Sequence, residues 1–170
     1  MMKVKITLNI DQVINLELYP EVAPKSVANF IEHVKKGTYK GVIFHRIIKD
    51  FMIQTGGYYI NDNTLIETPE CESISGEFSS NGFENNLKHE LGVISMARTS
   101  DPNSATSQFF ICAGTCTWLD GEYAAFGRTT DEASNEVVLG IANMPTMNIG
   151  GGFTDFPQYD IRIVDVEIVE

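Results

Sequence analysis

Between residues 44 and 57 the chain reads Phe44-His45-Arg46-Ile47-Ile48-Lys49-Asp50-Phe51-Met52-Ile53-Gln54-Thr55-Gly56-Gly57. Together with the two residues before it, this stretch contains two short apolar runs, Val42–Ile48 and Phe51–Gln54, separated by a polar pair. Both runs contain β-branched and aromatic residues and are too short for a typical helix. The stretch therefore predicts two strands joined by a tight turn.

The same pattern continues through the middle of the chain. Short apolar runs alternate there with clusters of Gly, Asn, Asp, Ser and Pro, and the runs lie at Val93–Ala97, Gln108–Cys112 and Ala124–Gly127. Such spacing indicates an all-β sandwich or barrel rather than repeated strand-helix-strand units.

Both ends of the chain add strands to this pattern. Residues 3–10 and 13–18 alternate apolar and polar side chains on either side of a polar link, which predicts an opening hairpin. The final segment, residues 159–170, predicts a last strand with Val164, Val166 and Ile168 on one face.

Two segments have helical spacing. Pro24 suits the first position of a helix, and Gly37 can close it. The apolar residues between them recur at helical spacing, at Val27, Phe30, Ile31 and Val34. Residues 132–143 predict a second, weaker helix. The least patterned stretch, residues 58–75, is expected to be a long surface loop. No linker or internal repeat interrupts the chain, so we expect a single domain over residues 1–170.

The composition limits the classes of partner. The 170 residues include 12 basic and 23 acidic side chains, and the formal net charge of −11 argues against binding to nucleic acid or anionic lipid. No apolar run approaches the roughly 20 residues that span a bilayer, so we expect no membrane segment. The first residues contain no signal-peptide core, and three cysteines leave at least one unpaired in a monomer. We therefore expect a cytoplasmic protein.

Motifs for metal, cofactor and nucleophile chemistry are incomplete. His89-Glu90 begins like a zinc-protease helix, but Val93 stands where the second histidine is needed. Cys112 and Cys116 have the spacing of half a metal site, but the histidines lie far away in sequence, so ordinary buried thiols are the favoured interpretation. Phosphate-loop, dinucleotide and Gly-x-Ser-x-Gly motifs are missing. We expect no metal and no cofactor.

Three further segments suggest a binding site. They are Ser95-Met96-Ala97-Arg98, Ser107-Gln108-Phe109-Phe110-Ile111-Cys112, and Trp118-Leu119-Asp120-Gly121 followed by Tyr123. With the opening stretch they place large apolar side chains beside uncharged amides, and the charge that recurs is arginine. Met52 and Gln54 share one face of a strand, and Gln108 and Phe110 share one face of another. An apolar pocket with an amide at its edge is the expected result, whereas a nucleophile with its base is not.

These motifs, in this order, closely resemble the cyclophilins, and the run from Ala97 to Gln108 is more similar to the bacterial-type branch. The resemblance implies a closed eight-stranded antiparallel barrel capped by two α-helices, with the active site on the outside of the barrel. The chain also departs from the family pattern. Tyr123 stands where many members have histidine, Lys49-Asp50 replaces Pro-Gly, and residues 58–75 lack the usual glycine-rich stretch.

The resemblance implies a role for each site residue. Arg46 is expected to be catalytic. The proline pocket is expected to consist of Phe51, Met52, Phe110 and Leu119. The peptide is expected to be held by Gln54, Gln108 and the backbone near Ala97 and Arg98, with Trp118 and Tyr123 at the rim. His45 is expected to point to the opposite face of the strand from Arg46 and to have a supporting role.

The function implied is peptidyl-prolyl cis-trans isomerisation, which assists protein folding in the manner of a chaperone. The expected partners are proline-containing peptides and unfolded or flexible proteins. Cyclosporin A is the expected inhibitor, because Trp118 stands where the family has its cyclosporin-binding tryptophan. We expect a monomer. The alternative is a proline-motif binding module with little or no catalysis. A metal- or redox-linked enzyme would require Cys71 to approach Cys112 and Cys116.

Overall fold

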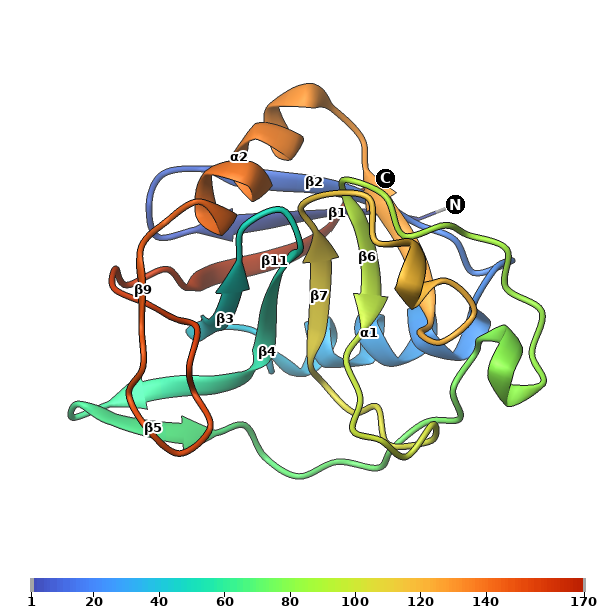
Figure 1. The fold of residues 1–170 in the computed structure, drawn as a ribbon, viewed down its shortest axis with the longest axis horizontal. Coiled ribbons are helices and arrows are strands. Elements are labelled where there is room, and N and C mark those ends of the chain that lie inside the picture. Colours follow the sequence, from blue (N-terminus) through green and yellow to red (C-terminus); the bar gives the residue numbers. More distant parts are fainter. Residues whose placement is uncertain (1, 170) are drawn as a thin grey trace.

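The computed structural model describes residues 2–169. Eight antiparallel strands follow one another around a curved sheet in the order β11-β1-β2-β8-β6-β7-β4-β3, and β5 pairs with β4 alone (Figure 1). The elements of this sheet are β1 (Met2–Leu8), β2 (Val13–Leu18), β3 (Val42–Ile48), β4 (Met52–Asn61), β5 (Thr64–Glu67), β6 (Val93–Met96), β7 (Phe109–Cys112), β8 (Ala125–Thr129) and β11 (Ile163–Val169). A separate two-stranded ribbon joins β9 (Thr146–Met147) to β10 (Phe156–Pro157).

The predicted eight-stranded antiparallel barrel is confirmed, except that its end strands β3 and β11 are joined by an isolated bridge and a few hydrogen bonds and not by a ladder. The amide of Gly41 donates to the carbonyl of Ile163 at 2.7 Å, and the amide of Phe44 donates to that of Ile161 at 3.0 Å. Further along β3, the amide of Ile47 donates to the carbonyl of Asp155 at 3.0 Å, just before β10. The segment leading into β10 therefore occupies the part of the β3 edge that a complete β3–β11 ladder would use.

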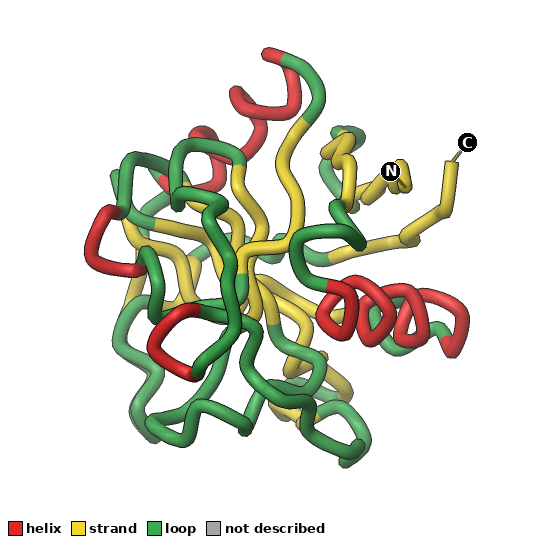
Figure 2. The backbone as a smooth tube through the Cα atoms, turned by 90° about the vertical axis from the view of Figure 1, so that its right-hand side faces the viewer, coloured by secondary structure: helices red, strands yellow, loops and turns green. Residues whose placement is uncertain are grey.

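Both predicted helices are present, and each closes part of the barrel interior. The helix α1 (Pro24–Lys36) contributes Val27, Phe30 and Ile31 to the main core cluster. The helix α2 (Glu132–Ala142) contributes Val138 and Ile141. Figure 2 shows the two helices outside the strands and well separated from each other. The core is therefore a barrel of strands with an apolar helix face over each end.

A buried carboxylate closes the amino end of α1. The residue before the helix, Ala23, has no side chain that can cap it. Instead Glu77, which is 1% exposed, accepts hydrogen bonds from the Ser26 amide at 2.6 Å, the Ser26 hydroxyl at 2.8 Å and the Lys25 amide at 3.1 Å. These donors belong to the first turn of the helix, where amides have no partner within the helix. Glu77, which is distant in sequence, therefore caps the amino end of α1.

The predicted face of the last strand is partly wrong. Val166 is buried, but Val164 is 50% exposed and Ile163 is buried in its place. The reason is a β-bulge, because Thr7 pairs with Asp165 whereas the next residue, Leu8, pairs with Ile163. The extra residue reverses the alternation. Ile168 is 39% exposed near the end of the strand, and the predicted last residue, Glu170, lies outside the described residues.

The expected long loop over residues 58–75 is a hairpin in its first half. Tyr58 pairs with Glu67, and the ladder continues to the turn at Asp62-Asn63. Both turn residues have positive φ, 50° and 60°, as a two-residue hairpin turn of the primed type requires. Asp and Asn tolerate this conformation better than most residues, so the Asp62-Asn63 pair was a turn signal.

Candidate active site

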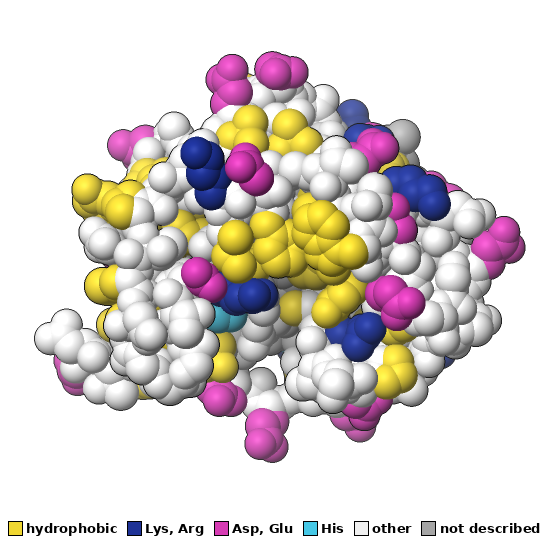
Figure 3. All heavy atoms as spheres, in the orientation of Figure 1, with side chains coloured by type: hydrophobic (Ala, Val, Ile, Leu, Met, Phe, Trp, Pro, Cys, Tyr) yellow, Lys and Arg dark blue, Asp and Glu magenta, His cyan; other side chains and the backbone are white. Residues whose placement is uncertain are grey.

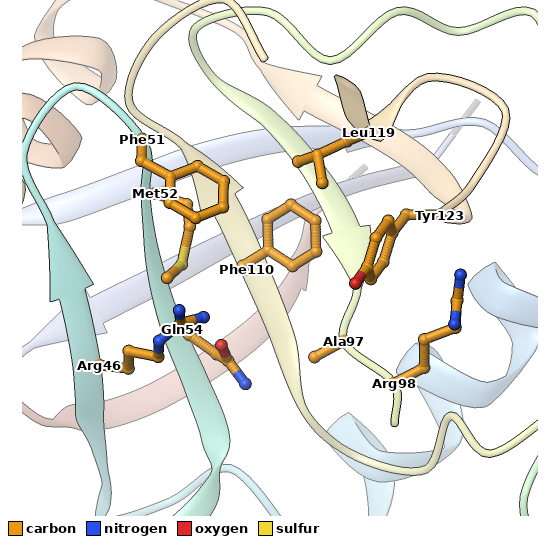
Figure 4. Close-up of a pocket in the computed structure, with 9 residues that line it drawn as sticks. All are labelled: Arg46, Phe51, Met52, Gln54, Ala97, Arg98, Phe110, Leu119 and Tyr123. Atoms are coloured by element: carbon orange, nitrogen blue, oxygen red, sulfur yellow. The ribbon is translucent and has the colours of Figure 1, made fainter. Parts of the chain in front are cut away.

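A pocket of about 200 Å³ lies on the outside of the barrel. Figure 3 shows hydrophobic side chains gathered over the centre of this face, with basic side chains along their lower border. Nine predicted site residues line the pocket, and Figure 4 shows them: Arg46, Phe51, Met52, Gln54, Ala97, Arg98, Phe110, Leu119 and Tyr123. The structure therefore brings together residues from four separate parts of the sequence.

The sheet register aligns the central side chains of the pocket. Arg46 on β3 pairs with Gln54 on β4, and Gln54 pairs in turn with Phe110 on β7. Directly paired residues on neighbouring strands present their side chains on the same face. The guanidinium, the amide and the phenyl ring therefore form one row across three strands, with Tyr123 on the far side of Phe110 (Figure 4).

A β-bulge sets the direction of Arg46. Phe44 pairs with Thr55 and Arg46 with Gln54, so His45 is an extra residue opposite this step of β4. Phe44 and Ile47 both belong to the barrel core, although they are three residues apart. The residues between them therefore lie together on the outer side. The prediction that His45 points away from the face of Arg46 was wrong, because strict alternation does not survive a bulge.

An apolar cluster separate from the barrel interior forms the floor of the pocket. Met52, Phe110 and Leu119 are buried in it, with Phe51 and Tyr123 packed against them. The rings of Phe110 and Tyr123 meet edge to face at a centroid distance of 5.8 Å. Leu119 comes from the short 3₁₀ turn η2 (Thr117–Leu119). Such a floor suits a compact apolar ring that enters from solvent.

His89 supports the Phe110 ring from behind and was not among the predicted site residues. The imidazole of His89 stacks on the Phe110 ring at 6.1 Å. Its Nδ1 lies 3.0 Å from Asp120 Oδ1 and its Nε2 lies 2.9 Å from Ser95 Oγ. The backbone amide of His89 also donates to Asp120 at 2.7 Å. His89 thus fixes the floor of the pocket, and the sequence carried no signal for it because its carboxylate partner lies 31 residues away.

Gln108 lies beside the pocket rather than in its lining. Its Oε1 accepts a hydrogen bond of 2.9 Å from Gln54 Nε2. With Gln54, Ala97 and Arg98 it lines an adjoining cavity of about 150 Å³. A Cβ atom on Gly57 would collide with the Gln108 side chain, so glycine at this position makes room for the pair of amides.

The other rim residues are placed by stacking and by backbone carbonyls. Trp118 is 59% exposed and contacts Phe51 at a ring distance of 5.5 Å, outside the pocket lining. The Arg98 guanidinium lies 4.5 Å from the centre of the Tyr123 ring and donates to the Glu122 carbonyl at 2.7 Å. The Arg98 side chain is therefore occupied by contacts within the rim. Trp118, in contrast, exposes an apolar face to solvent.

The two arginines of the pocket differ in their surroundings. Within residues 2–169, no carboxylate forms an ion pair with Arg46 within 4.0 Å, and its side chain is exposed. An exposed arginine would more often be a surface ion-pair partner. The Arg46 guanidinium instead faces the pocket with its donors available to a ligand.

The rate of a reaction promoted by Arg46 is expected to stay nearly constant between about pH 6 and 8. A guanidinium remains protonated throughout this range. Burial and the Arg46 charge lower the pKa of His45 to about 4, and burial lowers the pKa of His33 and of His89. The His45 imidazole is therefore neutral throughout this range, and the other two imidazoles are harder to protonate than free histidine. Rate measurements across a pH series check this, and a bell-shaped profile centred near neutrality would make a histidine the acid or base.

The family model and the relatives that match this chain all point to the same family. The family model described as cyclophilin type peptidyl-prolyl cis-trans isomerase/CLD matches residues 3–168. A peptidyl-prolyl cis-trans isomerase of Acinetobacter baylyi is 40% identical over 160 residues, which cover 91% of this chain and 79% of that protein. The peptidyl-prolyl cis-trans isomerase cyp15 of Rhizopus delemar is 37% identical over 155 residues. That alignment covers 91% of this chain but 22% of the longer relative.

A solved structure resembles the whole chain. The cyclophilin type peptidyl-prolyl cis-trans isomerase of Cryptosporidium parvum, crystallised in the presence of the dipeptide Ala-Pro, has a TM-score of 0.78 and 29% sequence identity. The match covers 99% of each chain.

Proposed function

The chain belongs to the family of cyclophilin-type peptidyl-prolyl cis-trans isomerases, and we propose that it carries out this reaction in the pocket between Arg46 and Tyr123. The match to the family model and the 40% identical relative confirm the resemblance that the motifs predicted. In this proposal Arg46 is the catalytic residue, and the floor formed by Met52, Phe110 and Leu119 receives the proline ring.

The reaction needs a donor more than it needs a nucleophile. Rotation about a peptide bond is opposed by about 18–20 kcal/mol, because the nitrogen lone pair is delocalised into the carbonyl group. In the twisted transition state the prolyl nitrogen becomes pyramidal and regains this lone pair. A guanidinium directed at it stabilises the twisted form more than the planar form, which is the condition for catalysis. No covalent bond is formed or broken.

One observation carries the assignment, namely the row from Arg46 through Gln54 to Phe110. A proline ring on Phe110 would place its nitrogen on the side of Arg46, and the Gln54 amide lies between them to hydrogen-bond the peptide backbone. The apolar floor fixes the ring while the preceding carbonyl rotates, and it lowers the local dielectric around the guanidinium.

The substrates proposed are X–Pro segments in peptides and in unfolded or flexible proteins. The Cryptosporidium structure with Ala-Pro supports this class, because that chain shares the fold over its full length. The pocket volume of about 200 Å³ suits one proline ring with its flanking backbone. A proline-binding module without catalysis would use the same floor but would not need the unpaired guanidinium.

The test is NMR exchange spectroscopy on a short Ala-Pro peptide, with the amide shifts of the protein recorded in the same titration. Catalysis appears as exchange between cis and trans peptide signals that is much faster than the uncatalysed time of tens to hundreds of seconds. The expected shift changes cluster at Gln54, Ala97 and Phe110. Binding at these amides without faster exchange would favour the binding-module alternative instead.

We also propose a monomer that works in the cytoplasm. Cys71, Cys112 and Cys116 form no disulfide among the described residues, which supports a reducing compartment. No helix within residues 2–169 is long and apolar enough to cross a membrane.

Cyclosporin A is expected to inhibit the isomerase. Trp118 supports this expectation, because it presents an exposed indole beside Phe51, with a broad apolar face and an N–H donor. Substituting Trp118 with alanine is expected to weaken inhibition by at least about tenfold, the loss of one good aromatic contact, with a smaller change in the uninhibited rate. Inhibition curves for both proteins check this. No inhibition at high micromolar cyclosporin, with catalysis intact, would contradict it.

A further inference from the structure

A second cavity lies away from the isomerase pocket and contains a cysteine beside a histidine. Its volume is about 390 Å³, and its walls come from the carboxyl end of α1, from β4 and from the segment after β5. The residues that matter chemically are Cys71, His33 and Thr38, with Lys36 and Lys40 on the wall. Among the described residues, none that lines this cavity also lines the isomerase pocket or the cavity adjoining it.

The three side chains form a continuous series of polar contacts. Cys71 Sγ lies 3.7 Å from His33 Nε2. On the other side of the ring, His33 Nδ1 lies 3.0 Å from Thr38 Oγ1. With the ring proton on Nδ1, His33 donates a hydrogen bond to the Thr38 hydroxyl. Its Nε2 then has a free lone pair directed at the Cys71 thiol. This is the arrangement of a nucleophile, its base and the group that orients the base.

The end of α1 makes this arrangement rigid. Gly37 adopts a left-handed conformation with φ of 76°, and the amide of Thr38 donates to the His33 carbonyl at 3.0 Å. The turn thus folds Thr38 back over His33. His33 is buried, with 5% of the residue exposed, and its ring lies 5.8 Å from the Tyr39 ring. Cys71 is more accessible, since it is only partly buried.

The protonation states favour a neutral pair at rest. Burial lowers the pKa of His33, so its imidazole is neutral near pH 7 and can accept a proton. Burial also raises the pKa of the Cys71 thiol, although the nearby Lys36 charge opposes this. The thiol therefore needs a base before it can attack, and His33 is placed to be that base.

We propose that Cys71, assisted by His33, undergoes thiol–disulfide exchange with small disulfides that carry carboxylates. The thiol proton passes to His33 Nε2, and Cys71 Sγ attacks one sulfur of the disulfide. A new S–S bond forms at Cys71 as the S–S bond of the small molecule breaks, and its second sulfur leaves as a thiolate. That thiolate can then take the proton from His33, so one disulfide is exchanged for another.

Two lysines on the cavity wall favour a small disulfide that carries a carboxylate. Lys36 and Lys40 line the cavity, and Glu70 is the one acidic side chain among its described lining residues. Both lysines also have acidic partners, Glu32 at 2.9 Å and Asp165 at 3.7 Å, which hold them in place. Each ammonium group has three N–H donors, so it can still donate to a carboxylate of the ligand while it is paired with its own partner.

The other two cysteines are not equivalent to Cys71. Cys112 and Cys116 are both 0% exposed. They belong to the apolar cluster beneath the isomerase pocket, and burial raises the pKa of each. The expectation of inert buried thiols therefore fits this pair, whereas Cys71 is set apart by its base and its cavity.

The experiment compares two small disulfides, oxidised glutathione as the anionic probe and cystamine as the cationic probe. Mass spectrometry of the folded protein follows the mixed disulfide over time at pH 7. We expect one adduct per chain at Cys71, absent in Cys71→Ser. His33→Gln is expected to slow both probes by at least about tenfold, and Thr38→Val, which keeps the base but not its orienting partner, by a smaller factor. Lys36→Gln is expected to slow oxidised glutathione more than cystamine.

Two measurements keep the test decisive. Circular dichroism and the isomerase rate are recorded for every variant and should match the wild type, because all of these positions lie outside the isomerase pocket. Should His33→Gln fail to fold, Thr38→Val and Lys36→Gln still test the orientation and the charge. An adduct that forms equally fast in His33→Gln or Thr38→Val, or no adduct with either disulfide, would overturn the proposal.

Discussion

Arg46→Ala is expected to lower the isomerisation rate by about 10²–10³, the usual effect of losing one donor to developing transition-state charge, ~2.7–4 kcal/mol. The barrel should remain folded, because Arg46 is exposed and its strand is held by Phe44 and Ile47 in the core. Affinity for the peptide should fall much less than the rate, since the floor that holds the proline ring is intact. NMR exchange on one Ala-Pro peptide measures both quantities.

Two further substitutions separate the charge of Arg46 from its geometry. Arg46→Lys keeps a positive charge but loses the planar group of N–H donors, so it should recover only a small part of the activity. Arg128→Ala is the matched control, because Arg128 is a strand arginine on β8 that lies outside the pocket. It should isomerise at the wild-type rate. A folded Arg46→Ala protein with near wild-type activity would remove Arg46 from the mechanism without changing the fold.

Glu77→Ala is expected to destabilise the protein by about 3 kcal/mol, or roughly 6–12 °C in Tm for a domain of this size. The substitution removes a buried acceptor that serves two amides and a hydroxyl at the first turn of α1. It also removes a negative charge from the positive end of the helix dipole. Chemical denaturation followed by circular dichroism gives the free energy of unfolding.

The controls for Glu77 use the same segment and the same side chain. Glu72→Ala removes an exposed carboxylate five residues earlier, and its effect should stay within about 0.5 kcal/mol. Glu77→Gln keeps one acceptor but loses the charge, so its effect should fall between those of the two alanine variants. If Glu77→Ala were as stable as Glu72→Ala, the end of α1 would have to be satisfied by water rather than by this carboxylate.

The sequence predicted those parts of the site that depend on local pattern. Met52 and Gln54 were expected on one strand face and Gln108 and Phe110 on another, and the sheet register does align Gln54 with Phe110. Both helices followed from apolar spacing, and Pro24 and Gly37 also marked the ends of the first. These features depend on residues that are close in sequence, so a periodic pattern contains the information.

Other features depend on contacts that a pattern cannot contain. The bulge at His45 moves a side chain across the sheet through a single extra residue, without any change in composition. Glu77 and His89 each act through partners dozens of residues away, so neither stands out in its own neighbourhood. The pairing of Cys71 with His33 is of the same kind, because 38 residues separate them. Fold class was thus predictable, whereas the supports of the site were not.

The pairing of the first and last strands has a mechanical consequence. In the antiparallel β1–β11 ladder Lys3 lies opposite Val169, so both ends of the described chain leave the barrel at the same place (Figure 1). A force that pulls these ends apart therefore acts on the outermost hydrogen bond first and opens the ladder one rung at a time. Strands pulled from opposite ends would instead share the load across all their rungs. The domain is consequently built to yield to tension at low force, however stable it is in solution.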